Sequence, residues 1–191
     1  STEAPKTLTA EEAVKVYEVR KALTLAIDRT LLVEQITRAG QVPATGFVPP
    51  GLKDSTGADF RATAGDYGIA TDASGIEEAK QLLADAGFPD GANFPTLTIL
   101  YNTSEGHKAI AEAIQEMWKQ NLNINVEIAN QEWAVFQDTR HQGNFQVARA
   151  GWIGDYEDPM TFLALWLSYS GNNDAQWKVT AYDDLIEASK L

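Results

Sequence analysis

Residues 148–159 read Ala-Arg-Ala-Gly-Trp-Ile-Gly-Asp-Tyr-Glu-Asp-Pro, and they set the order of strand, turn and helix on which the fold is built. A strand-forming run ends at a tryptophan that lies between glycines. An acidic turn follows, and the stretch ends in Asp-Pro, a pair typical of the start of a helix. Asp155 is thereby left at a strand end, beside glycines that let backbone pass close to a ligand. A single positioned carboxylate there can receive a cation such as an α-ammonium group.

The three acids of this turn allow a second interpretation. Asp155, Glu157 and Asp158 could form a metal or acid–base cluster, but such a turn is more often a solvated surface that ends in a helix cap. In that case Asp158 caps the helix and Pro159 is its first residue. The two histidines lie in no HExxH motif, and no GxSxG or Walker loop is present. We therefore expect no catalytic residue, metal site or cofactor, and no enzyme.

The chain around this turn alternates between helix and strand patterns. Helical spacing is found over 76–86, 104–120, 132–141 and 181–190, and strand-forming runs occupy 96–101, 124–129 and 145–152. Strands separated by helices of this length pair in parallel, which predicts an α/β fold with helices flanking the sheet. Ligands of such sheets bind beyond the carboxyl ends of the strands, where Asp155 is expected.

Helix-capping patterns organise the amino-terminal part. Thr9 and Glu12 form a capping-box pattern before an amphipathic helix predicted over 13–27, and Asp28 is expected to cap a second helix over 29–38.

A proline- and glycine-rich stretch follows these helices. Residues 42–51 are predicted to form an extended loop, and 52–71 to form a polar surface excursion. Ser74 with Glu77 repeats the capping-box pattern before the next helix.

Composition limits the possible partners. The chain has 191 residues, 44% of them hydrophobic, enough to bury the core of one domain. Its net charge of -12 argues against nucleic acid or an anionic membrane as a partner. Cysteine is absent, which excludes disulfides and thiolate metal sites. The sequence begins without Met and ends inside a helical pattern, from which we expect a mature or excised segment.

Aromatic and basic residues cluster near the final strand pattern. Trp133, Phe136 and Arg140 share one face of the predicted helix, either as a packed stripe with an extended arginine or as part of a binding surface. Arg149 lies among apolar residues of the strand, so it must pair with a carboxylate or reach a cleft. Trp152 lies on the opposite face of that strand.

Several motifs occur in an order that resembles the oligopeptide-binding proteins of ABC transporters. The matching segments are VRKAL at 19–23, AIDR at 26–29, PATG at 43–46, VPPG at 48–51, EAKQLL at 78–83, AGF at 86–88, QEW at 131–133, DTRH at 138–141, ARAGW at 148–152 and GDY at 154–156. The resemblance covers nearly the whole chain from about Val19.

The resemblance implies a bacterial receptor of the periplasm or the outer face of the cytoplasmic membrane. Such receptors are monomers with two lobes of the class II periplasmic-binding-protein fold, whose sheets are mixed, mainly parallel and flanked by helices. They close around a peptide and deliver it to an ABC permease in the membrane. Residues 1–191 are then a single carboxyl-terminal lobe, without the amino-terminal lobe, and we expect this chain alone to bind peptides weakly or undetectably.

The resemblance also assigns ligand-binding residues. Asp155 is similar to the aspartate that pairs with the peptide's α-ammonium group. Four residues resemble side-chain-pocket residues, and the two arginines among them also meet carboxylates or the peptide C-terminus through water: Trp133, Arg140, Arg149 and Trp152. Asn172 falls near a polar position of the cleft.

The sequence is also compatible with other functions. A relative of the same family could receive a dipeptide, nickel, haem or another solute, and a signalling receptor that senses peptides would have the same lobe. A ligand without an ammonium group has no use for an unpaired cleft carboxylate, so Asp155 favours peptides. An enzyme that used the acidic turn would instead show metal-dependent turnover.

Overall fold

The computed structural model describes residues 7–191 and divides into two compact units. The first unit comprises the described residues up to Pro43, together with Gly68–Phe136 and Phe145–Arg149. The second comprises Ala44–Tyr67, Gln137–Asn144 and Ala150–Leu191. The assignment of residues 1–191 to a single lobe stays a prediction.

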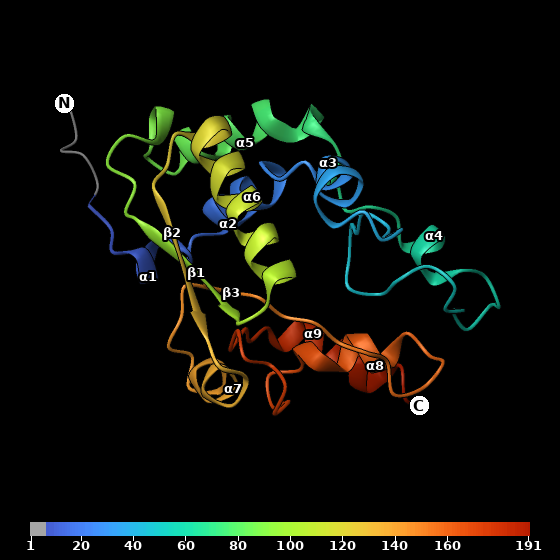
Figure 1. Cartoon of the computed structure of the whole chain (residues 1–191). Helices are drawn as coiled ribbons and strands as arrows, with labels where there is room; N and C mark the ends of the chain where they lie inside the picture. Colours follow the sequence, from blue (N-terminus) through green and yellow to red (C-terminus); the bar gives the residue numbers. More distant parts are fainter. Residues whose placement is uncertain (1–6) are drawn as a thin grey trace, which may run out of the picture. The chain divides into compact units, whose positions relative to one another are not determined.

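A parallel three-stranded sheet forms the centre of the first unit (Figure 1). The central strand β1 (Leu97–Asn102) pairs with β2 (Val126–Gln131) on one side and with β3 (Val147–Ala148) on the other. Helices connect the strands in sequence, as parallel pairing requires. The predicted α/β fold with helices flanking a parallel sheet is therefore confirmed, and the three described strands are all parallel.

The helix after β1 follows its sequence signals closely. Helix α6 (Glu105–Leu122) begins after Ser104, whose hydroxyl accepts a hydrogen bond from the amide of His107. It ends where Asn123 adopts a left-handed conformation, which an asparagine tolerates. Helix α6 packs against β1 and β2, and α7 (Trp133–His141) then leads from β2 towards β3.

The remaining helices of the first unit are α1, α2, α3 and α5, with bounds Ala10–Ala13, Tyr17–Leu25, Arg29–Leu31 and Ile76–Asp85. A π-helical turn, Leu32–Thr37, continues α3, and 3-10 turns are found at Ala73–Gly75 and Pro89–Gly91. Helices α2 and α5 pack on each other, and α5 also contacts α6. Their apolar faces close the core around the sheet.

The core of the first unit joins the sheet to these helices. Phe88, Leu97 and Ile124 are at most 1% exposed, and the Phe88 and Phe94 rings pack edge to face with centroids 5.0 Å apart. Trp118 is also buried, and its indole Nε1 donates a hydrogen bond of 2.9 Å to the carbonyl of Leu23. A buried indole N–H requires such a partner, so this bond fixes α6 against α2.

The capping box at the start of the chain is confirmed, but the helix it opens is short. The amide of Glu12 donates to Thr9 Oγ1 over 3.2 Å, and the amide of Thr9 donates to Glu12 Oε1 over 3.3 Å. Helix α1 ends at Ala13, and α2 begins only at Tyr17, so the single helix predicted over 13–27 is wrong.

The break between α1 and α2 has a visible cause. Nη1 of Arg20 donates hydrogen bonds to the carbonyls of Val14 and Lys15, at 3.2 and 2.7 Å. These carbonyls lie at the end of α1 and would otherwise lack an intrahelical partner. The arginine of the second helix thus stabilises the end of the first.

The second predicted capping box, Ser74 with Glu77, is not formed, because Asp72 caps this part of the chain. Asp72, rather than Ser74, accepts the capping bond, which the amide of Ser74 donates over 2.9 Å. The side chain of Glu77 pairs with Lys80 instead. The prediction was wrong because Asp72 lies earlier in the chain and opens a 3-10 turn before α5.

The strand predicted over 145–152 is much shorter than expected. Only Val147–Ala148 pair with β1, and the amide of Arg149 adds one bond of 2.8 Å to the carbonyl of Leu100. On the amino-terminal side, Oε1 of Gln146 accepts the amide of Thr98 over 2.9 Å, so a side chain replaces a backbone pairing. Trp152 therefore lies in an irregular segment and belongs to no strand face.

The second unit is built from short helices and loops. It contains α4 (Phe60–Ala64), α8 (Met160–Leu163), a 3-10 turn at Ala164–Trp166, α9 (Thr180–Ala188) and the last residues of α7. Tyr182 of α9 donates its hydroxyl to the carbonyl of Leu163 over 2.6 Å, and burial raises the pKa of Tyr182 to about 12. The tyrosine therefore stays protonated and ties α9 to the end of α8.

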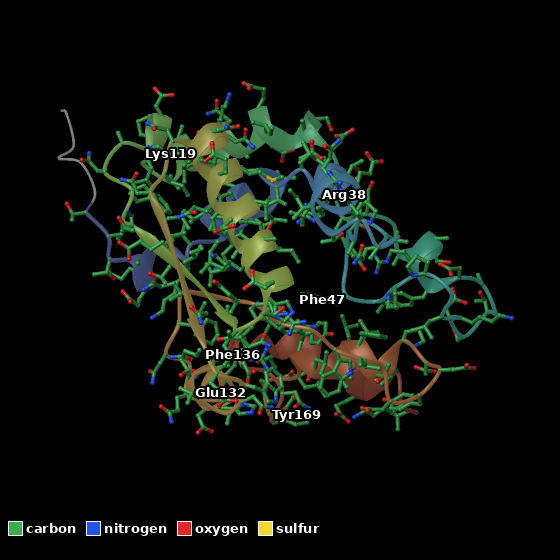
Figure 2. The ribbon with its side chains drawn as sticks, viewed as in Figure 1. Arg38, Phe47, Lys119, Glu132, Phe136 and Tyr169 are labelled. Carbon is green, nitrogen blue, oxygen red and sulfur yellow. The ribbon has the colours of Figure 1, made fainter. Side chains whose placement is uncertain are left out.

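The loop expected over 42–71 contains α4 but is otherwise irregular, and Arg61 holds its central part together. Nε of Arg61 donates to the carbonyl of Val48 over 3.0 Å, and Nη1 donates to that of Gly65 over 2.7 Å. The ring of Phe47, labelled in Figure 2, lies 4.3 Å from that of Trp166 between centroids. Side chains thus order a segment without regular backbone pairing.

A matched pair of leucines tests the assignment of the core. Leu83 in α5 is 1% exposed, whereas Leu185 in α9 is 70% exposed. We expect Leu83→Ala to lower the free energy of unfolding by about 2–5 kcal/mol. The control Leu185→Ala should change it by less than about 0.5 kcal/mol. Urea unfolding followed by circular dichroism measures both, and equal losses would contradict the assignment.

Candidate functional site

The six residues predicted to contact a ligand fall in both compact units. Trp133 and Arg149 belong to the first, and the second holds Arg140, Trp152, Asp155 and Asn172.

The carboxylate of Asp155 is exposed, but its backbone is held. Its amide donates a hydrogen bond of 2.9 Å to Oγ1 of Thr161, a residue of α8 that is 4% exposed. Within residues 7–191, the carboxylate itself makes no hydrogen bond or ion pair. Asp155 thus presents a charged group to solvent from an anchored backbone.

Asp158 has the other role expected in this turn. Its carboxylate accepts a hydrogen bond of 2.8 Å from the amide of Met160, and its carbonyl accepts the amide of Thr161 over 3.2 Å. Asp158 therefore bonds to the first amide of α8 as expected, but the prediction of Pro159 as the first helical residue is wrong, because α8 starts at Met160 and Pro159 occupies the cap position without a side-chain bond. In the part of the chain that the structure describes, no three His, Cys, Asp or Glu side chains are grouped as metal ligands.

Gly154 brings this turn into close contact with α8. A Cβ at this position would lie 3.1 Å from Cγ2 of Thr161 and 3.3 Å from Cε2 of Phe162, closer than ordinary packing allows. The close approach at Gly154 is thus made to α8, and the approach to a ligand expected at these glycines stays a prediction. The neighbouring side chains face solvent, since Trp152 is 37% exposed and Ile153 is 91% exposed.

Arg140 is paired within the second unit. Its Nε lies 3.2 Å from Oδ2 of Asp174, and Nδ1 of His141 lies 2.7 Å from Oδ1 of the same carboxylate. The side chains of Arg140 and Asp174 are only 14% and 17% exposed. Sequence reasoning missed Asp174 because no periodicity connects it to Arg140, and its place in the polar SGNND run was the only signal.

Asn172 belongs to the same loop as this ion pair. It is exposed, and its carbonyl accepts the amide of Asp174 over 3.0 Å. The next residue, Asn173, is buried, and its Nδ2 donates to the carbonyls of Leu167 and Trp177, at 3.1 and 2.7 Å. Asn173 therefore fixes the loop, and Asn172 is the member of the pair that is available to a ligand.

In the first unit, Arg149 lies directly after β3, at the carboxyl ends of the strands. Its Nη1 is 3.4 Å from Oδ1 of Asn102, the last residue of β1. Nδ1 of His107 lies 3.0 Å from the carbonyl of Asn102. The arginine is half-buried, so the expectation that it must find a polar partner or a cleft is met at least by Asn102.

Trp133 and Phe136 of α7 have different surroundings. Phe136, labelled in Figure 2, is fully buried, whereas Trp133 is 47% exposed, with ring centroids 6.1 Å apart. The interpretation as a packed stripe thus holds for Phe136 and not for Trp133. An aromatic ring left half-exposed at the start of a helix, after a strand of the sheet, is available for contact.

Comparison with known proteins shows the family of this chain. Residues 8–174 match the model described as bacterial extracellular solute-binding proteins, family 5 Middle. The chain belongs to this family. The family binds solutes, which agrees with the expectation that the chain is not an enzyme.

Several relatives are similar to this chain in sequence and in structure. The periplasmic oligopeptide-binding protein OppA of Salmonella typhimurium is 46% identical over 169 residues, which cover 88% of this chain and 30% of the relative. The structure of Haemophilus influenzae OppA in complex with RPPGFSPFR is 37% identical with a TM-score of 0.80, covering 92% of this chain and 34% of that one. A structure described as a peptide-binding protein of a peptide ABC transporter is 28% identical with a TM-score of 0.85, covering 98% and 82%. The chain spans about 30% of the length of the curated relatives it matches.

The ion pair of Asp174 yields a testable expectation. Asp174→Asn removes the charge that compensates Arg140, and a charge left in a mostly buried place is destabilising. We expect a loss of about 1–3 kcal/mol in the free energy of unfolding, measured by urea denaturation. The exposed Asp184 provides the control, and Asp184→Asn should change stability by less than about 0.5 kcal/mol. A loss no greater than in this control would show that the pair does not stabilise the loop.

Proposed function

We propose that this chain forms part of the substrate-binding component of an ABC transporter that captures oligopeptides. In this proposal, the carboxylate of Asp155 pairs with the α-ammonium group of the bound peptide. The observation that carries it is the contrast within one turn: the carboxylate of Asp158 accepts the first amide of α8, while Asp155 has an anchored amide and a free carboxylate. An unused carboxylate on a fixed backbone is suited to a cationic ligand.

The family and its relatives support a peptide as the ligand. OppA of Salmonella typhimurium is named as an oligopeptide-binding protein, and RPPGFSPFR, in complex with which Haemophilus influenzae OppA was solved, is a peptide sequence. Nickel and haem lack an ammonium group, so neither would form the ammonium–carboxylate pair proposed for Asp155. Among the ligands considered, peptides make the best use of this residue.

The chemistry suits a receptor that accepts many sequences. All unmodified peptides share one terminal ammonium, one terminal carboxylate and the backbone amides. A charge-assisted bond from Asp155 to the ammonium is short and strong, so it fixes the position of the peptide whatever its side chains are. Water in the side-chain pockets can then adapt to different residues.

The other five residues keep the roles that the resemblance gives them. Trp133 and Trp152 are exposed enough to contact peptide side chains, and Asn172 offers a polar group on a fixed loop. Arg149 would meet a carboxylate of the peptide directly or through water. Arg140 is already paired with Asp174, so we assign it to the wall of a pocket, with water between it and the ligand.

In this proposal, the protein acts outside the cytoplasmic membrane, as the description of its family implies. No helix among the described residues is both long and apolar enough to cross a membrane. We propose that it works as a monomer and delivers the peptide to an ABC permease in the membrane. Nucleic acid is not a proposed partner, because a net charge of -12 repels it.

Calorimetry with a defined pentapeptide tests the role of Asp155. In the complete gene product that carries this sequence, we expect Asp155→Asn to weaken binding by about 10- to 100-fold, because one charge-assisted bond is lost. N-acetylation of the peptide should weaken binding to the unmodified protein to a similar degree. The matched control is Glu157→Gln, which neutralises an exposed carboxylate two residues away and should leave the affinity within about two-fold.

Two results would contradict the proposal. If the Asp155→Asn variant and the unmodified protein bind the pentapeptide with equal affinity, Asp155 does not pair with the peptide ammonium group. The protein would belong to another ligand class if the unmodified protein bound no unblocked peptide but did bind a solute that lacks an ammonium group.

A further inference from the structure

We infer that Thr161 is a positioning residue for ligand binding, which fixes the carboxylate of Asp155 through the backbone of that residue. This inference rests on the proposed role of Asp155 and adds the element that makes it effective. Thr161 lies on α8 and is buried, so it cannot be an exposed contact of the ligand.

The two branches of the Thr161 side chain hold the turn at consecutive residues. Its Oγ1 accepts the amide of Asp155 over 2.9 Å, and its Cγ2 lies against Gly154, where an added Cβ would be only 3.1 Å away. The hydroxyl sets the direction of the Asp155 backbone, and the methyl group sets how closely the turn approaches α8. The Thr161 side chain thus fixes both the position and the orientation of the backbone at Gly154 and Asp155.

The helix that carries Thr161 is itself held at both ends. The carboxylate of Asp158 accepts the amide of Met160 at its start, and the hydroxyl of Tyr182 donates to the carbonyl of Leu163 at its end. Because α8 has only four residues, these contacts supply rigidity that its length cannot. Thr161 therefore connects the Asp155 turn to a fixed support.

A fixed backbone matters for the affinity of a charged pair. The carboxylate of Asp155 has no partner among the described residues that would hold it in place before the ligand arrives. If its amide were also free, binding would have to order the turn, which reduces affinity without removing any contact. The Thr161 bond does this ordering in advance.

Threonine variants separate the hydroxyl from the rest of the side chain. Thr161→Val keeps the branched shape and the methyl contact with Gly154 but cannot accept the amide of Asp155. Thr161→Ser keeps the hydroxyl and loses the methyl group. In the complete gene product, we expect Thr161→Val to weaken binding of an unblocked pentapeptide by about five-fold, and Thr161→Ser to retain affinity within about two-fold.

The Asp155→Asn background tests whether Thr161 acts through Asp155. There, Thr161→Val should cause no further loss beyond about two-fold, because the charged pair that it positions is already absent. The same variant should leave binding of the N-acetylated peptide unchanged within that range. A purely structural role would weaken both peptides, and both backgrounds, to the same degree.

The outcomes are distinguishable. If Asp155→Asn binds as tightly as the unmodified protein, the proposed function fails. If Asp155→Asn weakens binding but Thr161→Val does not, or if Thr161→Val acts equally on both peptides, the role of Thr161 is overturned. Should the valine variant fail to fold by circular dichroism, Thr161→Ala replaces it in the comparison with Thr161→Ser, and equal affinities of those two would also overturn the inference.

Discussion

Parallel pairing of β1 with both neighbours is the constraint on which the first unit depends. It brings the carboxyl ends of three strands to one edge, because parallel strands run in the same direction. It also requires each connection to return along the sheet, and α6 does so between β1 and β2 while its apolar face closes the core. The hydrogen bond from Trp118 to Leu23 then joins this helix to α2, so the pairing of strands and the packing of helices support each other.

The second unit depends on side-chain hydrogen bonds to a greater extent than on regular backbone pairing. Asn173, Arg61 and Tyr182 each donate to carbonyls of loops or helix ends. The same principle organises the acidic turn, where Asp158 accepts an amide of α8 and Thr161 accepts the amide of Asp155. The charge of Asp155 is available because its neighbours supply the bonds that the turn needs.

Much of the fold could be predicted from local signals. The capping box of Thr9 and Glu12, the cap at Ser104 and the bond of Asp158 to the first amide of α8 all join residues two or three apart, so the local sequence contains both partners. The alternation of helix and strand predicted the parallel sheet in the same way. Predictions failed where a side chain other than the expected group made the hydrogen bond: Arg20 bonds to the end of α1, Asp72 replaced Ser74 as a cap, and Gln146 took the place of a strand pairing.

The sequence by itself determined the α/β order, the bond from Asp158 to the start of α8, and a resemblance that the family match bears out. Periodicity, short-range caps and motif order are properties of neighbouring residues, which is why they are readable in one dimension. Only the tertiary structure decided that Asp174 compensates Arg140, and that Phe136 is buried while Trp133 is not. These facts depend on which distant segments the folded chain brings into contact, and no spacing along the sequence encodes that choice.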